Sequence, residues 1–176
     1  MTNVVFHDGA EKSFAEGTVL DALIEHDKSI VNKTVAARVN GEVVDLKRAL
    51  DAFSDPVNIE PIMVDSADGL TILRHSTAHV LAQAVQSLFE NAKVTIGPVI
   101  EDGFYYDFDV ETPFTPEDLQ RIEKKMKEII KKNHKIERES VTKEEALKLF
   151  GDAGENYKVE IVEELEEGEV TLYSQD

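Results

Sequence analysis

The sequence contains no cysteine and no tryptophan. Without cysteine the chain cannot form a disulfide bond, a thiolate metal site or a catalytic cysteine nucleophile. No hydrophobic run approaches the roughly 20 residues that a membrane-spanning helix needs. The first residues also lack the basic and apolar regions of a secretory signal. We therefore expect a cytoplasmic protein that has no membrane partner.

Basic residues are scarce relative to acidic ones. The chain holds 36 Asp and Glu against 19 Lys and Arg, which gives a net charge of −17 at pH 7. Residues 1–64 carry 11 acids and 6 bases, and residues 65–176 carry 25 acids and 13 bases. A surface of this charge repels polyanions. Nonspecific nucleic-acid binding is therefore disfavoured, and contact with RNA requires a local basic patch.

One stretch of the sequence could provide such a patch. Its basic residues are Lys124, Lys125, Lys127, Lys131, Lys132, Lys135 and Arg138. Apolar residues interleave with them at helical spacing, which is typical of an amphipathic helix with a solvated outer face. Contact with RNA phosphate is the alternative interpretation. The interleaved apolar residues favour the solvated face, and both interpretations stay open.

Residues 1–64 predict a small ubiquitin-like sheet with one helix across a face. Thr18 followed by Asp21 is typical of a helix N-terminus. Asn40 and Gly41 fit the two central positions of a type I′ hairpin turn. The expected strands cover residues 4–6, 35–39, 42–44 and 57–62.

Residues 65–176 predict a second unit of mixed helices and strands, so the fold class is α+β. A helix is expected over residues 70–90, and two capping pairs, Thr115 with Asp118 and Thr142 with Glu145, predict two more. The expected buried stripe of the helix after Thr115 is Leu119, Ile122, Met126, Ile129 and Ile130. The expected strands cover residues 94–96, 104–110, 158–162 and 170–173.

His75 and His79 are the residues best suited to chemistry. On a helix they lie one turn apart, with Cβ atoms about 5–6 Å from each other, on the side opposite the expected apolar stripe. This spacing suits two neutral nitrogens that hold one metal ion, or that hydrogen-bond one substrate or water. The small side chains of Ala78 and Ala82 would leave room for a ligand. Spacing alone equally allows two solvated histidines.

A structural metal site needs about four ligands. The two histidines would therefore bind a metal only if residues absent from this chain completed the site. For this reason we assign no metal ligand from these residues alone.

Three stretches resemble the N-terminal region of bacterial-type threonyl-tRNA synthetases. They are RHSTAH at residues 74–79, IGPVIEDGFYYD at residues 96–107 and GENYKV at residues 154–159. The stretch ARVNGE at residues 37–42 resembles the TGS domain that precedes the editing domain in that family. The resemblance implies a β-grasp TGS domain over residues 1–64 and part of the editing domain over residues 65–176.

The resemblance also implies a function. In that family the editing domain hydrolyses serine that was mistakenly attached to tRNA-Thr, in a ligase that joins threonine to tRNA-Thr with ATP. His75 and His79 would line the editing pocket and help to place the attacking water. Lys158 would help to bind the terminal adenosine and the ester region, and Tyr106 would shape the pocket. Lys158 considered alone could equally be a surface lysine at a strand edge.

The resemblance further implies parts that this sequence lacks. The family's editing domain continues into a Cys-x3-His element, and separate domains bind ATP, magnesium, threonine, a zinc ion and the anticodon. The parent is expected to be a homodimer. We therefore expect an N-terminal piece of such an enzyme that cannot charge tRNA and that hydrolyses little or no seryl-tRNA alone. The alternatives are a noncatalytic TGS module that binds RNA or a nucleotide, and a zinc-dependent trans-editing hydrolase of aminoacyl-tRNA.

Overall fold

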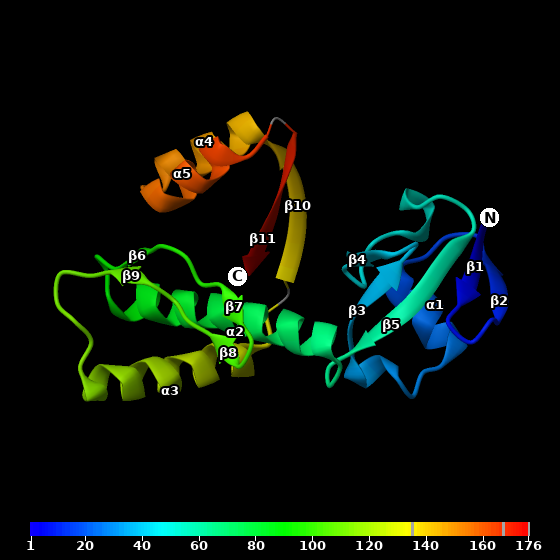
Figure 1. Ribbon diagram of the computed structural model, residues 1–176, viewed down its shortest axis with the longest axis horizontal. Helices are drawn as coiled ribbons and strands as arrows, with labels where there is room; N and C mark the ends of the chain where they lie inside the picture. The colour runs from blue at the N-terminus through cyan, green and yellow to red at the C-terminus, as the bar shows by residue number, and fades with distance from the viewer. Residues whose placement is uncertain (135, 167, 176) are drawn as a thin grey trace. The chain divides into compact units, whose positions relative to one another are not determined.

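A computed structural model describes residues 1–134, 136–166 and 168–175. The chain divides into two compact units, Met1–Arg74 and His75–Asp176 (Figure 1). The division falls within a helix, whereas the last strand of the first unit ends at Met63. Both units mix helices with short strands, so the predicted α+β class is confirmed.

The first unit is a five-stranded sheet with one helix packed on it. The strand order is β2-β1-β5-β3-β4; β1 and β5 run parallel, and the other neighbours run antiparallel. Figure 1 shows α1 lying across one face of this sheet. Its elements are β1 (Thr2–Phe6), β2 (Glu11–Phe14), α1 (Val19–His26), β3 (Thr34–Val39), β4 (Glu42–Val44) and β5 (Val57–Met63), with 3-10 turns at Val31–Lys33 and Leu50–Ala52.

Local sequence explains how these elements begin and turn. The Thr18 hydroxyl accepts a hydrogen bond from the Asp21 amide, and the Asp21 carboxylate accepts one from the Thr18 amide at 2.9 Å. Asn40 and Gly41 both adopt positive φ, at 49° and 91°, as a type I′ turn requires. Alternating side chains of the strands and one face of α1 then bury a single apolar cluster, which includes Val4, Leu23, Leu50 and Ile59.

The second unit is built around two long helices. Helix α2 (Ala67–Leu88) enters from the first unit, and α3 (Pro116–Lys132) packs on it through a cluster that includes Val85, Ile122 and Ile129. The remaining elements are β6 (Lys93–Val94), β7 (Val99–Ile100), β8 (Gly103–Phe104), β9 (Phe108–Asp109), β10 (Ile136–Thr142), α4 (Lys143–Asp152), α5 (Asn156–Glu164) and β11 (Glu169–Gln175). Strands pair as β6–β9, β7–β8 and β10–β11.

The prediction of a strand over residues 158–162 is wrong, because this segment lies in helix α5. The β-branched residues Val159, Ile161 and Val162 suggested a strand. Val159 and Val162 also share a helical face, and Val162 is buried at 4% exposure in a helix that packs against α4. Tertiary packing therefore overrides the local strand preference. The alternative of a strand-edge Lys158 is wrong for the same reason.

Other details also differ from the predictions. The strand expected over residues 94–96 is the shorter β6, Lys93–Val94, and strand β2, Glu11–Phe14, was not expected. Residues 136–142 form β10, which shows no apolar alternation and was not expected. The expected strand over residues 104–110 is divided into β8 and β9. Leu119 and Ile130 are about 60% exposed rather than buried, because α2 covers only the strip of α3 that carries Ile122 and Ile129. Lys135 of the basic stretch lies outside the described residues.

Candidate functional site: the histidine pair of α2

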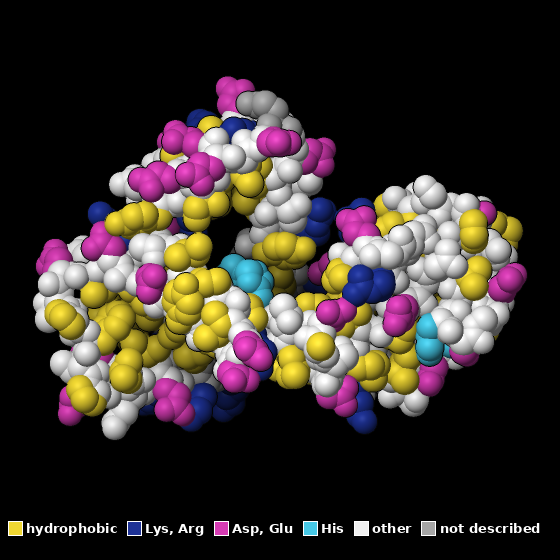
Figure 2. Space-filling model, in the orientation of Figure 1, with side chains coloured by type: hydrophobic (Ala, Val, Ile, Leu, Met, Phe, Trp, Pro, Cys, Tyr) yellow, Lys and Arg dark blue, Asp and Glu magenta, His cyan; other side chains and the backbone are white. Residues whose placement is uncertain are grey.

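His75 and His79 lie one turn apart on α2, and their rings are in direct contact. The two Nε2 atoms are 2.9 Å apart, and the ring planes meet edge to face at 84°. One ring must therefore donate the proton of this hydrogen bond and the other must accept it. Both side chains keep contact with solvent, and Figure 2 shows histidine at the surface of this unit over α2. The structure thus brings together the two histidines that the spacing predicted.

The surroundings of His79 favour its neutral form. Partial burial lowers the pKa of His79, and the charges of His75 and Lys158 lower it further. A neutral imidazole offers one hydrogen-bond donor and one acceptor. At neutral pH the pair can therefore orient a water molecule or a polar group of a ligand without carrying two positive charges.

The expectation that Ala78 and Ala82 leave room for a ligand is wrong. Ala78 is 2% exposed and Ala82 is 7% exposed, so neighbouring atoms already fill the space beside them. The apolar contacts of α2 extend further around the helix than the single stripe that periodicity indicated. A ligand of the histidine pair must therefore approach the rings from their solvent side.

Lys158, on helix α5, lies close enough to His79 for its charge to lower the pKa of that ring. Its Nζ atom lies 3.4 Å from Oε1 of Glu155 and 5.3 Å from the centre of the Phe150 ring. The same Glu155 oxygen accepts a hydrogen bond from Nε2 of Gln86 at 3.0 Å. Gln86 lies on α2, seven residues or about two turns beyond His79 and hence on the same strip of the helix. Glu155 thus connects α5 to the histidine-bearing face of α2.

Tyr106 lies between β8 and β9, and its ring stacks on Phe108 with 4.9 Å between centroids. A Cβ atom at Gly97 would meet the Tyr106 ring at 2.2 Å, so the ring packs directly on this glycine. Burial and the negative charge of Glu155 raise the pKa of Tyr106, which keeps the phenol protonated. Tyr106 is therefore a neutral hydrogen-bond donor near the negative charge of Glu155.

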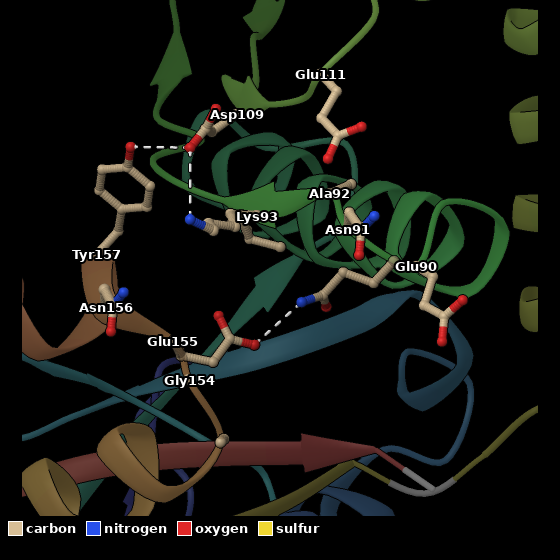
Figure 3. Close-up of a pocket in the computed structure, with 13 residues that line it drawn as sticks. Glu90, Asn91, Ala92, Lys93, Asp109, Glu111, Gly154, Glu155, Asn156 and Tyr157 are labelled. Carbon is tan, nitrogen blue, oxygen red and sulfur yellow. Dashed lines mark hydrogen bonds and ion pairs between the residues drawn. The ribbon is translucent and has the colours of Figure 1, made fainter.

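A cleft of about 520 Å³ is lined in part by Gln86 and Glu155 (Figure 3). Its lining is acidic and includes Glu90, Asp109, Glu111 and Glu155. The Tyr157 hydroxyl donates to Asp109 at 3.3 Å. The histidines, Lys158 and Tyr106 do not line the cleft, whereas Gln86 and Glu155 line it and also connect α5 to the histidine-bearing face of α2.

Sequence reasoning missed Glu155 and Gln86. Their spacing from expected site residues could have indicated them. Gln86 lies seven residues after His79, and Glu155 lies three residues before Lys158. The second signal depends on helix α5, which was expected to be a strand.

Within residues 1–134, 136–166 and 168–175, no three His, Cys, Asp or Glu side chains gather as a metal site would require. The donor set at the histidine pair is therefore two nitrogens that already hydrogen-bond each other. Over the same described ranges, no helix combines the length and the apolar character needed to cross a membrane.

Comparison with known proteins gives close relatives but no matching family model. The chain is similar to the threonine–tRNA ligases of Citrifermentans bemidjiense, Acidithiobacillus ferrooxidans and Clostridium tetani, at 47%, 45% and 42% identity. The alignments cover 98% or 99% of this chain and 27% of each relative. The chain therefore spans about a quarter of the length of the curated relatives that it matches.

Proposed function

Because the chain belongs to the threonine–tRNA ligase family, we propose that it is the N-terminal region of an enzyme that joins threonine to tRNA-Thr with ATP. Within that enzyme, its second unit contributes to the hydrolysis of seryl-tRNA-Thr. The observation that supports this role is the contact between His75 and His79, 2.9 Å apart and next to the positive charge of Lys158. An ester-hydrolysing site needs such groups, which hold water and attract an anionic substrate.

The reaction is the hydrolysis of an ester between serine and the terminal ribose. Water adds to the carbonyl carbon, the bond to the ribose oxygen breaks, and that oxygen takes up a proton. The products are free serine and uncharged tRNA. In this scheme the neutral His79 accepts a hydrogen bond from the water, and His75 fixes the orientation of His79 through the Nε2 contact.

Lys158 and Tyr106 have binding roles in the same scheme. The Lys158 ammonium attracts the phosphate and ester oxygens at the end of the tRNA. Tyr106 is held by its stacking on Phe108 and by its close approach to Gly97, and it presents a protonated phenol. It shapes the side of the pocket and can donate to a substrate oxygen.

Proofreading is needed for a physical reason. Serine lacks one methyl group of threonine, and one methyl group changes binding by about 1–3 kcal/mol in a pocket. A single selection step therefore leaves a substantial error. A second, hydrolytic selection on the finished ester lowers that error.

The test is direct binding of a stable substrate analogue. The chain is labelled on its histidine rings and titrated with an adenosine whose 3′-amine carries serine as an amide. We expect saturable NMR shifts of both His75 and His79. His79→Ala and Lys158→Ala should weaken binding by about tenfold or more, the loss that corresponds to one charge-assisted contact.

His7→Ala is the matched control, because His7 is an exposed histidine of the first unit. It should bind the analogue as the unaltered chain does. Equal affinity in His79→Ala and His7→Ala, or no shift of the His75 and His79 rings at saturating analogue, would contradict the proposal.

The remaining parts of the proposal concern the longer protein. ATP, magnesium, threonine and a zinc ion take part in its synthetic reaction and are bound outside this chain. The protein acts in the cytoplasm as a homodimer with tRNA-Thr as partner. None of the steps assigned to His75, His79, Lys158 or Tyr106 passes through a metal or through ATP.

A second candidate function rests on α3. Lys124, Lys131 and Lys132 are exposed on this helix and form a lysine-rich strip, which also carries the exposed Glu128, in an otherwise acidic chain. Such a strip suits phosphate contact, which would make the chain a noncatalytic RNA-binding module. tRNA affinity that survives changes at both His75 and His79 but is lost when these lysines are changed would favour the module.

A further inference from the structure

Glu155 stands at the start of α5, but its side chain does not cap the amides of that helix. It is the N-cap residue of α5, yet its carboxylate makes no capping hydrogen bond. Ser, Thr, Asp and Asn are preferred at this position because their short side chains reach the first helical amides. Thr115 and Thr142 make such bonds at the starts of α3 and α4. Glutamate at position 155 makes no such capping bond, and its carboxylate has other partners.

The Glu155 carboxylate instead connects two helices. Its Oε1 atom accepts a hydrogen bond from Gln86 on α2 at 3.0 Å and lies 3.4 Å from Nζ of Lys158 on α5. The side chains of Glu155 and Lys158 are 20% and 36% exposed, so water screens this pair less than it screens an open surface pair. One oxygen therefore ties the lysine of α5 to the histidine-bearing strip of α2.

Lys158 is also supported from a second direction. Its Nζ atom lies 5.3 Å from the centre of the Phe150 ring on α4. A lysine side chain is long and flexible, so a free ammonium samples many positions. A carboxylate and an aromatic ring together restrict it.

The charged and titratable groups around His79 come from three elements. His75 belongs to the same helix, and Lys158 comes from α5 with Glu155 next to it. Tyr106, from the segment between β8 and β9, lies near enough to Glu155 for that carboxylate to raise its pKa. The charges that shift the pKa of His79 are those of His75 and Lys158. A change at Glu155 is therefore expected to alter the pKa of His79 by moving Lys158.

We propose that Glu155 is a positioning residue that holds the Lys158 ammonium beside the histidine pair and binds this arrangement to α2 through Gln86. The relevance of this arrangement to substrate rests on the editing role proposed above. The geometry of Glu155, Lys158 and Gln86 does not rest on that role, because the structure shows it without substrate.

The experiment measures the pKa of His79 by NMR titration of the free chain. In Glu155→Ala the lysine is released, its positive charge moves away from His79, and the His79 pKa should shift upward toward the ordinary histidine value. Lys158→Ala should shift it in the same direction. Because Glu155 acts through Lys158, Glu155→Ala should cause no further shift in a chain that already carries Lys158→Ala.

Glu155→Gln distinguishes the charge from the shape of the side chain. The amide keeps an oxygen that can accept from Gln86 but loses the ion pair with Lys158. We expect an upward shift of the His79 pKa with an unchanged far-UV circular dichroism spectrum. Glu160→Ala is the matched control, because Glu160 is an exposed acid on another face of α5. A His79 titration in Glu155→Gln and Glu155→Ala that matches the Glu160→Ala control would overturn the proposal.

The positioning role and the editing role can fail separately. If Glu155→Ala shifts the His79 titration while the seryl analogue never binds, positioning stands and the editing role is wrong. If the analogue binds and needs His79 and Lys158, Glu155→Ala should weaken it by about tenfold. Unchanged affinity together with an unchanged His79 titration would overturn positioning and leave editing in place.

Discussion

The Nε2 atoms of His75 and His79 lie 2.9 Å apart, within hydrogen-bonding distance and across one turn of α2. Two protonated rings could not share this contact, since each Nε2 would then carry a hydrogen. The contact therefore requires at least one neutral ring. This makes the pair sensitive to pH in the range where histidines titrate.

The first prediction concerns stability and pH. The pKa of His79 is lower in the folded chain than in the unfolded one, so the unfolded chain binds more protons between the two values. The contribution of His79 to stability is therefore complete above its unfolded pKa and is lost as pH falls through that value toward the folded pKa. We expect the melting temperature of the second unit to drop between about pH 7.5 and about pH 5.5.

Circular dichroism melts at several pH values measure this effect, with His79→Gln as the variant and His7→Gln as the control. His79→Gln should flatten the pH dependence, whereas His7→Gln should leave it steep. Equal pH dependence in the two variants would show that His79 does not carry it. His75→Ala should in addition raise the pKa of His79, because the charge of His75 lowers it.

The second prediction concerns the support of Tyr106. Gly97→Ala places a methyl group 2.2 Å from one carbon of the Tyr106 ring and 2.4 Å from another. The ring stacks on Phe108 and cannot move without disturbing that contact. Overpacking of this kind costs about 1–3 kcal/mol. We expect a lower denaturation midpoint and a changed Tyr106 environment in near-UV spectra.

Gly151→Ala is the matched control for this prediction. Gly151 lies within α4, and a Cβ atom there would meet nothing within 4 Å. Alanine is favoured over glycine inside a helix by roughly 1 kcal/mol, so this variant should be as stable as the unaltered chain or more stable. A Gly97→Ala variant with the same midpoint as Gly151→Ala would mean that the Tyr106 ring moves freely.

The third prediction concerns the core of the first unit. Leu23 on α1 is fully buried, at 0% exposure, whereas its neighbour Ile24 is 38% exposed. Leu23→Ala removes buried methyl groups and leaves a cavity, at a cost of about 2–5 kcal/mol. In a unit of this size such a loss approaches the whole stability. We expect Leu23→Ala to lose the ordered amide spectrum of residues 1–63, while Ile24→Ala keeps it.

The fourth prediction concerns RNA contact by α3. Lys124 and Lys131 are seven residues apart, which is about two helical turns, and so share one strip. If this strip meets phosphate, changing Lys124, Lys131 and Lys132 to glutamine should reduce the salt dependence of tRNA binding. The slope of log affinity against log salt should fall by about two units.

The control replaces three lysines elsewhere, Lys28, Lys33 and Lys148, with the same change in net charge. This variant should keep the slope of the unaltered chain, because its lysines lie outside α3. Equal slopes in both triple variants would mean that only the overall charge matters and that α3 is a solvated helix face.

Short-range features of the fold were predictable because short-range chemistry determines them. The capping pairs at Thr18, Thr115 and Thr142 all form as predicted, since a hydroxyl and a carboxylate three residues apart reach each other's amides in any helix start. The turn at Asn40 and Gly41 follows from the positive φ that these residues tolerate. The His75–His79 contact follows from the pitch of a helix.

What depended on distant neighbours was not predictable. Three of residues 158–162 are β-branched, which predicted a strand, yet packing on α4 makes the segment helical and thereby places Lys158 one turn after Glu155, the N-cap residue of that helix. Ile130 fits an apolar stripe, yet α2 leaves it 60% exposed. Glu155 and Gln86 are 69 residues apart in the chain, and no local pattern predicts that they meet.

The sequence alone thus determined where helices start, where the chain turns and which two histidines face each other, because each depends on residues within one or two turns. The tertiary structure alone decided which helix faces are covered, that α5 is a helix, and that Glu155 brings Lys158 together with α2. These depend on burial and on contacts between segments far apart in the chain, and the free energy of such contacts exceeds local preference.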